Sequence, residues 1–452
     1  MESGIRERLA DLAEEAPPRL EADLDLWQQG RALRRRRTAL NATATVVALV
    51  ALAGLVGLVL PAGRPGVAPA SGQVGMPEVF YKPSPWLPGT DDEGPLGQLV
   101  AVQVAARKGW FSASEGVVGV SAATGEYRFL DLPGLTQDPT GQVALSPDGR
   151  HVAYWATGPI SGTPDTEDTD GARPPAGVAI YDTATGDVQR ALVPTRHGLT
   201  AYSLTWLDDE HVVMAFGQYL GAHGERAGMM GRGRARLLTL GRHGSSRVAP
   251  GADVGFATLA GNGHGMLVVN DYARRFGVVE VRHPRVVVAH RLSEPVLDDL
   301  VLDPTGSRVA GIYPGPHPER TSGNSHRPLL VGAVGGGRMV RLHQVPRYRF
   351  TGRVVGWVDP QHVLARAHRP PSYDPRFESV DVRSGQVRTV TVLRSNNWGI
   401  ELAGDLLGAP PVAGHRPPSP WDPRAKAFLG LLCVLALGWG AERLWRVRRV
   451  RA

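Results

Sequence analysis

Residues 145–156 read LSPDGRHVAYWA, in which a Ser-Pro-Asp-Gly turn separates one apolar residue from a mostly apolar run. This pattern predicts a turn that leads into a β-strand with Val152 and Tyr154 on one face. It returns at 302–313, LDPTGSRVAGIY, and in a looser form at 259–269. We therefore interpret 145–156 as one unit of a repeated scaffold and not as a reaction site.

The turn inside this unit has a defined chemistry. Pro147 presets φ, and Gly149 tolerates the left-handed backbone conformation that the turn requires. The side chain of Ser146 or Asp148 is expected to bond to the local backbone.

A second repeated pattern couples tryptophan with histidine. WLDDEHVVMA at 206–215 matches WVDPQHVLAR at 357–366, so that His211 and His362 occupy equivalent positions. Recurrence at the same place in a repeat favours a structural role for both imidazoles.

Between these units lie segments that predict short hairpins, with a strand, a small polar turn containing Gly, and a second strand. The segments are 118–132, 178–192 and 378–392, with Gly125, Gly186 and Gly385 at the expected left-handed positions and a rougher version at 329–345. Each unit thus comprises two hairpins, or four short strands.

The Ser-Pro-Asp-Gly turn followed by an alternating strand resembles the TolB-type, WD-repeat-like β-propeller motif over roughly residues 95–395. The resemblance implies an all-β fold, namely a propeller of about six four-stranded blades. A count of five to seven blades is compatible with the repeats. Either 398–407 or 77–82 would close the ring. It implies almost nothing about function, because propellers serve binding proteins and enzymes alike.

Two apolar segments flank the repeats and predict transmembrane helices. Residues 38–60 form an uncharged run long enough to cross a bilayer, and Arg34 to Arg37 precede it. A cleaved signal peptide ending near Ala70 is the alternative. The second run, 427–441, is short for a span, and an interfacial or buried helix is its alternative. Five arginines follow it, which favours a cytoplasmic C-terminus.

These segments predict a double-anchored protein of the bacterial plasma membrane, with its central domain outside and both termini in the cytoplasm. The abundance of arginine over lysine, of which there are three, is typical of GC-rich bacterial coding. The expected parts are a cytoplasmic segment 1–37, a transmembrane helix 38–60, a linker 61–94, the propeller 95–410, a Pro-rich linker 411–425, a second transmembrane helix 426–444 and a basic tail 445–452.

Charge and cysteine content exclude some classes of protein. The net charge is +7, but a large part of it lies beside the second apolar run. No basic face for nucleic acid is therefore predicted. The lone Cys433 can form no internal disulfide and no cysteine-rich metal site.

No catalytic, cofactor or metal site is predicted. The loop 164–171 carries four acids but lacks the register of a calcium loop, and we interpret it as a solvated insertion. The sequence has neither a G-x-S-x-G nor a P-loop motif. We expect no enzyme; a surface hydrolase built from dispersed residues is the least favoured alternative.

The expected function is a non-enzymatic binding or interaction scaffold with a protein partner at the cell surface and the lipid bilayer as its anchor. The alternative is a signalling protein that couples the propeller to a cytoplasmic partner through residues 1–33. There Leu9 and Leu24 belong to two short amphipathic stripes. A simple tether is the other interpretation of this segment.

The two-span topology makes a direct prediction. In vesicles oriented with the outer face exposed, added protease should leave both termini intact while cutting the central domain. Labelling of the C-terminus from outside would contradict the second span.

Overall fold

The computed structural model describes residues 74–136, 143–165, 171–222, 228–242, 244–248, 258–270, 274–284, 287–313, 326–335, 337–368, 374–394, 399–420 and 422–450. The chain divides into two compact units, one comprising residues 65–420 and the other 1–64 with 421–452. The predicted cytoplasmic segment 1–37 and first span 38–60 lie outside the described residues.

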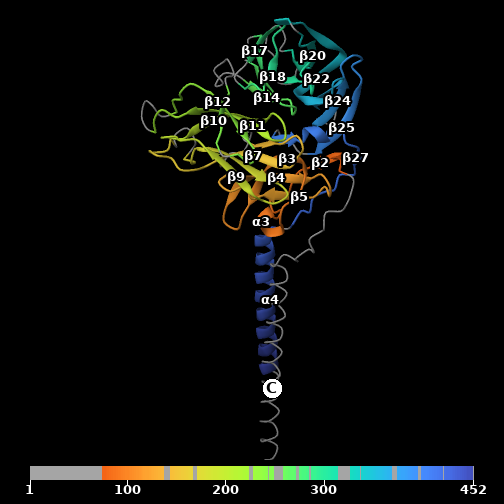
Figure 1. Ribbon diagram of the computed structural model, residues 1–452. Coiled ribbons are helices and arrows are strands. Elements are labelled where there is room, and N and C mark those ends of the chain that lie inside the picture. Colours follow the sequence, from red (N-terminus) through yellow and green to blue (C-terminus); the bar gives the residue numbers. More distant parts are fainter. Residues whose placement is uncertain are drawn as a thin grey trace, which may run out of the picture. The chain divides into compact units, whose positions relative to one another are not determined.

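The larger unit consists of antiparallel meanders that follow one another in the colour order of the chain around a ring (Figure 1). The first meander is β26 (Ile400–Leu402), β3 (Leu99–Lys108), β4 (Ala113–Ser121) and β5 (Tyr127–Leu130). The second is β6 (Val143–Leu145), β7 (His151–Ala156), β8 (Gly177–Asp182) and β9 (Val188–Leu192). The third is β10 (Leu199–Trp206), β11 (His211–Gln218), β12 (Arg234–Thr239) and β13 (Ser246–Val248).

Of the remaining three meanders, the last two share one long strand. The fourth is β14 (Thr258–Gly261), β15 (Met266–Asn270), β16 (Arg275–Glu280) and β17 (Val287–Leu292), with β21 (Met339–Val340) parallel at its edge. The fifth is β18 (Leu297–Leu302), β19 (Arg308–Ile312), β20 (Arg327–Ala333) and the start of β22 (Leu342–Asp359). The rest of β22 begins the sixth, with β23 (His362–His368), β24 (Arg376–Asp381) and β25 (Val387–Arg394).

Hydrophobic side chains on both faces of each meander hold the ring together. Val152 and Tyr154 of β7 pack against the first meander, whereas Ala153 and Trp155 pack toward the third. This is the alternation that the sequence predicts, except that both faces are buried. Similar clusters join each meander to the next and join the sixth to the first. A sequence of four-stranded meanders packed face to face in a closed circle is a β-propeller.

The chain closes the ring from both ends. β26, near the C-terminal end of the domain, pairs antiparallel with β3 and becomes the innermost strand of the first meander. β2 (Val79–Tyr81) adds a parallel strand to the outer edge of the sixth. Both segments considered from sequence for closure, 398–407 and 77–82, therefore take part.

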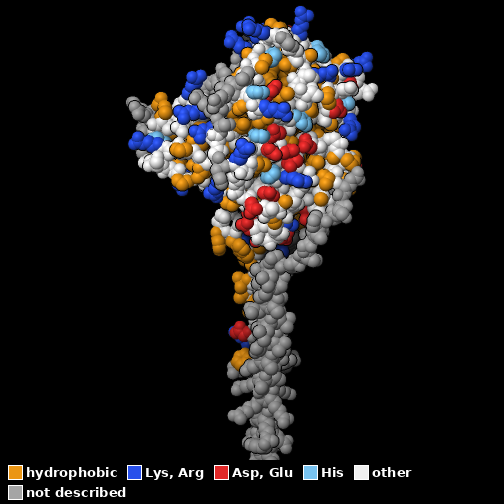
Figure 2. All heavy atoms as spheres, in the orientation of Figure 1, with side chains coloured by type: hydrophobic (Ala, Val, Ile, Leu, Met, Phe, Trp, Pro, Cys, Tyr) orange, Lys and Arg blue, Asp and Glu red, His pale blue; other side chains and the backbone are white. Residues whose placement is uncertain are grey.

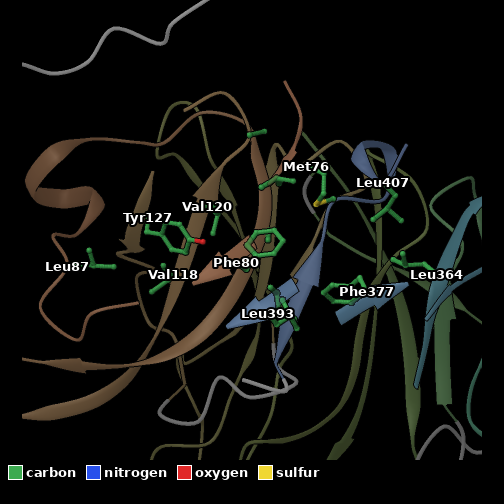
Figure 3. Packing of buried hydrophobic residues seen from close by; sticks show 14 of the residues in the cluster. Met76, Phe80, Leu87, Val118, Val120, Tyr127, Leu364, Phe377, Leu393 and Leu407 are labelled. Carbon is green, nitrogen blue, oxygen red and sulfur yellow. The ribbon is translucent and has the colours of Figure 1, made fainter. Parts of the chain in front are cut away.

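A hydrophobic cluster fills the seam where the first and last meanders meet (Figure 3). Phe80 of β2 lies between Tyr127 of β5 and the pair Phe377 and Leu393 of the sixth meander, and is fully buried. The segment 61–94, which we interpreted from sequence as a linker, thus contributes β1 (Met76–Pro77), β2 and the short helix α3 (Thr90–Glu93). β1 pairs with β27 (Pro411–Val412).

The repeated tryptophans tie neighbouring inner strands together. Trp206 Nε1, at the end of β10, donates to the carbonyl of Ala144 in β6 (3.0 Å), and Trp357 Nε1 donates to the carbonyl of Val301 in β18 (3.3 Å). Both indoles are nearly buried. A buried donor left without its acceptor costs about 1–3 kcal/mol of folding free energy. Each of these two hydrogen bonds therefore favours one position of the inner strand relative to its neighbour.

The smaller unit contains the helix α4 (Pro423–Val450). Asp422 begins it, because its carboxylate accepts from the backbone N–H of Arg424 (2.9 Å). Among the described residues, α4 holds the one stretch, Pro423–Gly440, that is long and apolar enough to cross a membrane by length and composition. The helix is longer than the expected span 426–444, because good helix formers continue through the basic tail.

The hairpin glycines give a matched stability test. Gly125, Gly186 and Gly385 all have the predicted positive φ, at 68°, 82° and 72°. A Cβ on Gly385 would lie 1.8 Å from the carbonyl oxygen of Pro346, whereas one on Gly186 would meet nothing closer than 3.6 Å.

Gly186→Ala should therefore destabilise the domain by about 1–2 kcal/mol, the cost of a left-handed L-residue. Gly385→Ala should cost ~1–3 kcal/mol more, because a packed backbone must also shift. Thermal unfolding of the full chain in detergent, followed by circular dichroism, measures both. Equal losses would contradict the close approach at Pro346.

Candidate functional site

A hollow of about 670 Å³ opens between the second and third meanders. The turns that join first to second strands and third to fourth strands form its wall. Its lining residues are Asp148, Arg150, His151, Asp209, Glu210, His211, Thr239, Leu240, Gly241 and Arg242. We call this surface the turn-end hollow. On the face shown in Figure 2, acidic and histidine side chains gather near the middle of the ring domain.

The first wall is the Ser-Pro-Asp-Gly turn. Ser146 Oγ donates to Asp148 Oδ1 (2.6 Å) and accepts from the backbone N–H of His151 (2.9 Å). Asp148 Oδ1 also accepts from the backbone N–H of Arg150 (2.9 Å). Gly149 has φ 73°, and a Cβ there would lie 2.0 Å from the carbonyl oxygen of Leu99. The side-chain contacts and the left-handed Gly149 are those that the sequence predicts. The close approach of Gly149 to the first meander is an additional contact that the structure shows.

The second wall is the turn between β10 and β11. Asp208 Oδ1 accepts from the backbone N–H groups of Glu210 and His211 and contacts His211 Nδ1 at 2.8 Å. Asp208 is thus occupied by its own turn, while the next two residues line the hollow. His362 Nδ1 lies 2.9 Å from Asp359 Oδ1 in the sixth meander, so the two repeated histidines do perform the same structural task.

Asp209 links the two walls. Its Oδ1 accepts from the backbone N–H of Asp148 (2.9 Å). Asp405, in the short helix η4 (Gly404–Leu406) after the closing strand, approaches the same turn, because its N–H donates to the carbonyl of Pro147 (3.0 Å). Burial raises the pKa of Asp209, and the charges of Asp148, Asp405 and Asp208 raise it further.

Basic groups balance the carboxylates at the rim. Arg150 and Arg242 are exposed, and the Arg150 Nε lies 4.0 Å from Asp148 Oδ2. His151 is held from the other side, with Nε2 3.9 Å from Asp182 Oδ2 and its ring centroid 6.1 Å from that of Trp206. The hollow therefore offers both signs of charge and several N–H donors within one open surface.

The lining residues include no Ser, Cys or Lys, whereas the two aspartates, Glu210 and the two histidines are groups that could bind a ligand or exchange protons. Across the described ranges, no group of three or more His, Cys, Asp or Glu side chains is arranged to hold a metal ion.

The acidic loop 164–171 lies only in part within the described residues, since 166–170 are outside them. Asp165 is described, and it is fully buried: its Oδ2 accepts from the backbone N–H of Gly228 (2.8 Å) in the third meander. For Asp165 the expectation of a solvated position is wrong, because this carboxylate joins two neighbouring loops.

The sequence did not predict the turn-end hollow. Asp148 and Asp209 are 61 positions apart, and only the packing of successive meanders brings them together. The available signal was the recurrence of Asp at the turn positions of several units, at Asp148, Asp208, Asp303 and Asp359.

Comparison with known proteins gives likeness at the level of fold. No family model and no curated protein matches the sequence. The β-propeller domain of the trilobed protease from Pyrococcus furiosus is 12% identical, with 66% of this chain and 83% of that chain covered and a TM-score of 0.41. A putative TolB from Agrobacterium tumefaciens is 12% identical, with 59% of this chain and 85% of that chain covered and a TM-score of 0.33.

Dipeptidyl peptidase 4 from Porphyromonas gingivalis is also similar, at 10% identity and a TM-score of 0.35. The similarity covers 64% of this chain and 44% of the peptidase chain. The similar structures thus include parts of two peptidases and a putative TolB. The fold is a β-propeller, and its strand topology establishes this directly.

The raised pKa of Asp209 predicts a pH-dependent stability. A carboxyl whose pKa is raised in the folded state stabilises the fold below its ordinary value of 3.8 and loses that contribution as pH rises through the folded value. Asp209→Asn keeps the acceptor oxygen and removes the charge. The variant should therefore unfold at a higher temperature than the wild type at pH 7, and the gap should close below about pH 4. A gap independent of pH would contradict this assignment.

Proposed function

We propose that this protein is a membrane-anchored, extracytoplasmic six-bladed β-propeller that binds a polar segment of a protein partner without catalysis. The turn-end hollow carries the proposal. Two blades contribute carboxylates to its lining, through Asp148 and Asp209, while Arg150 and Arg242 stand at the rim. Asp405 of a third blade lies near enough for its charge to raise the pKa of Asp209.

The chemistry of the hollow favours a peptide segment that bears both charges. A cationic side chain would meet Asp148 and Asp209, and a carboxylate would meet Arg242. The opening is wide and the rim arginines are exposed, as suits a loop or extended segment on another protein more than an enclosed small molecule.

The proposed anchor is α4, whose exposed apolar side chains include Phe428, Leu431 and Leu435. The arginines that follow this stretch support a cytoplasmic C-terminus. With that orientation of α4, the propeller would lie outside the cell. An N-terminal span at 38–60 and a cytoplasmic segment 1–37 complete the proposed topology, with residues 1–33 as the part that would report to a cytoplasmic partner in the signalling alternative.

A site-specific photo-cross-linker in the full chain tests the binding site. At position 242 it should form an adduct with an extracytoplasmic protein in intact cells, and at position 388, on the exposed outer strand β25, it should not. Asp148→Asn with Asp209→Asn should reduce the adduct at 242 about tenfold or more, because a hydrogen bond to a charged group contributes about 1.5–3 kcal/mol.

Deletion of residues 2–30 separates the two functional alternatives. An adduct at 242 that persists after the deletion supports the scaffold, and loss of a cytoplasmic partner on the same deletion supports signalling. Equal adducts at 242 and 388 would overturn the assignment of the hollow.

A further inference from the structure

Exposed arginines gather where the fourth and fifth meanders meet at the outer edge of the ring. Arg275 of β16 stands directly opposite Arg291 of β17, and Arg291 is aligned with Met339 of β21. The carbonyl of Arg338 accepts from the backbone N–H of Arg291 (2.6 Å), and these four side chains are all exposed. Lys and Arg side chains lie along this edge in Figure 2, where Figure 1 labels β17 and β20.

Two more exposed arginines extend the cluster. Arg274 precedes β16, and its carbonyl accepts from the backbone N–H of Leu292 (2.8 Å). Arg341 follows β21 and lies beside Ser293, whose backbone N–H donates to the carbonyl of Val340 (3.0 Å). The five side chains, which we call the arginine row, are Arg274, Arg275, Arg291, Arg338 and Arg341.

The arginine row is unfavourable for the domain alone. Like charges that stand directly opposite one another on two strands destabilise a sheet. Within the described part of the chain, no ion pair involves Arg274, Arg291 or Arg338. Arg274 also has a positive φ of 70°, a backbone conformation that costs free energy in any residue other than Gly. Strain that the fold does not relieve is typical of sites that bind a ligand.

The order of side chains in the row fits an extended acidic segment of a protein. Neighbouring strands lie about 4.8 Å apart, so Arg275, Arg291 and Met339 form a line about 10 Å long. Alternate side chains of an extended peptide repeat at about 7 Å, which matches a line of this length. Met339 is 55% exposed, and it offers a flexible apolar contact that a polymer of phosphates has no group to use.

The bilayer is not favoured as the ligand of this surface. The chain leaves the ring unit beside the turn between β4 and β5, where His415 packs against Gly125. That turn belongs to the first meander, and the fourth meander stands three places further along the ring. Nothing in the departing chain therefore brings the arginine row to a membrane.

We propose that the arginine row is a second docking surface, which binds an acidic and partly apolar segment of a protein partner. Carboxylates of that segment accept hydrogen bonds from the guanidinium groups of Arg275 and Arg291, and an apolar side chain packs on Met339. The row shares no residue with the lining of the turn-end hollow. The proposal therefore depends neither on the hollow nor on α4 as an anchor.

Titration of the full chain in nonionic detergent with a fluorescein-labelled synthetic peptide tests this surface. The peptide alternates Glu with Ser and carries a central Leu. Arg291→Gln with Arg338→Gln should weaken its binding about fivefold or more, because each exposed ion pair contributes a modest free energy. Arg232→Gln with Arg234→Gln, at exposed positions of the third meander, changes the net charge equally and should leave binding unchanged.

The apolar part of the proposal has its own control. Met339→Gln should weaken binding of the peptide with Leu and leave binding of the same peptide with Ser in place of Leu unchanged. Equal weakening of both peptides would overturn the role of Met339. Equal losses in the two double arginine variants would show that only the net charge of the chain matters, and would overturn the docking surface.

Inorganic polyphosphate distinguishes a phosphate ligand from a peptide. If it binds more tightly than the peptide and depends equally on Arg291 and Arg338, the row is a site for phosphates and the proposal is overturned. Circular dichroism melts check the fold of the variants. Loss of like charges at Arg291 and Arg338 should leave the unfolding temperature unchanged or higher, and a lower value would contradict the repulsion from which the proposal is argued.

Discussion

The pairing of β26 with β3 is the constraint on which the rest of the structure depends. Every meander presents apolar side chains on both faces, so each needs a neighbour on each side, and only a closed ring supplies one to the first and the last. Ile400 and Leu402 align with Gln103 and Ala101, and the cluster around Phe80 then fills the seam. Without this pairing, two apolar faces and two strand edges would be open to water and to other chains.

Closure also adds a third carboxylate near the proposed binding surface. The closing strand leads directly into η4, where Asp405 meets the turn of the second meander. Asp209 reaches that turn from the third. Asp405 therefore approaches the other two carboxylates because the ring is closed, and the charges of Asp148 and Asp405 both raise the pKa of Asp209. A cationic ligand could relieve this repulsion.

Much of the scaffold could be predicted from sequence because its determinants are local. The turn glycines, the Ser146 and Asp148 contacts and the equivalence of Trp206 with Trp357 depend on a few neighbouring positions. The continuity of β22 across two meanders could not be predicted in this way, since Arg347 with its positive φ of 57° lies inside the strand and no turn signal marks the passage. The turn-end hollow and the buried Asp165 arise from contacts between meanders, which periodicity does not encode.

Amide hydrogen exchange of the full chain, read by mass spectrometry over residues 399–407, tests closure most directly. The account predicts protection of the β26 amides comparable to that of the inner strands β6 and β10, because the strand is bonded to β3 along its length. Exchange of 399–407 as fast as that of the exposed residues 110–112, with β6 and β10 still protected, would show an open ring and contradict the account.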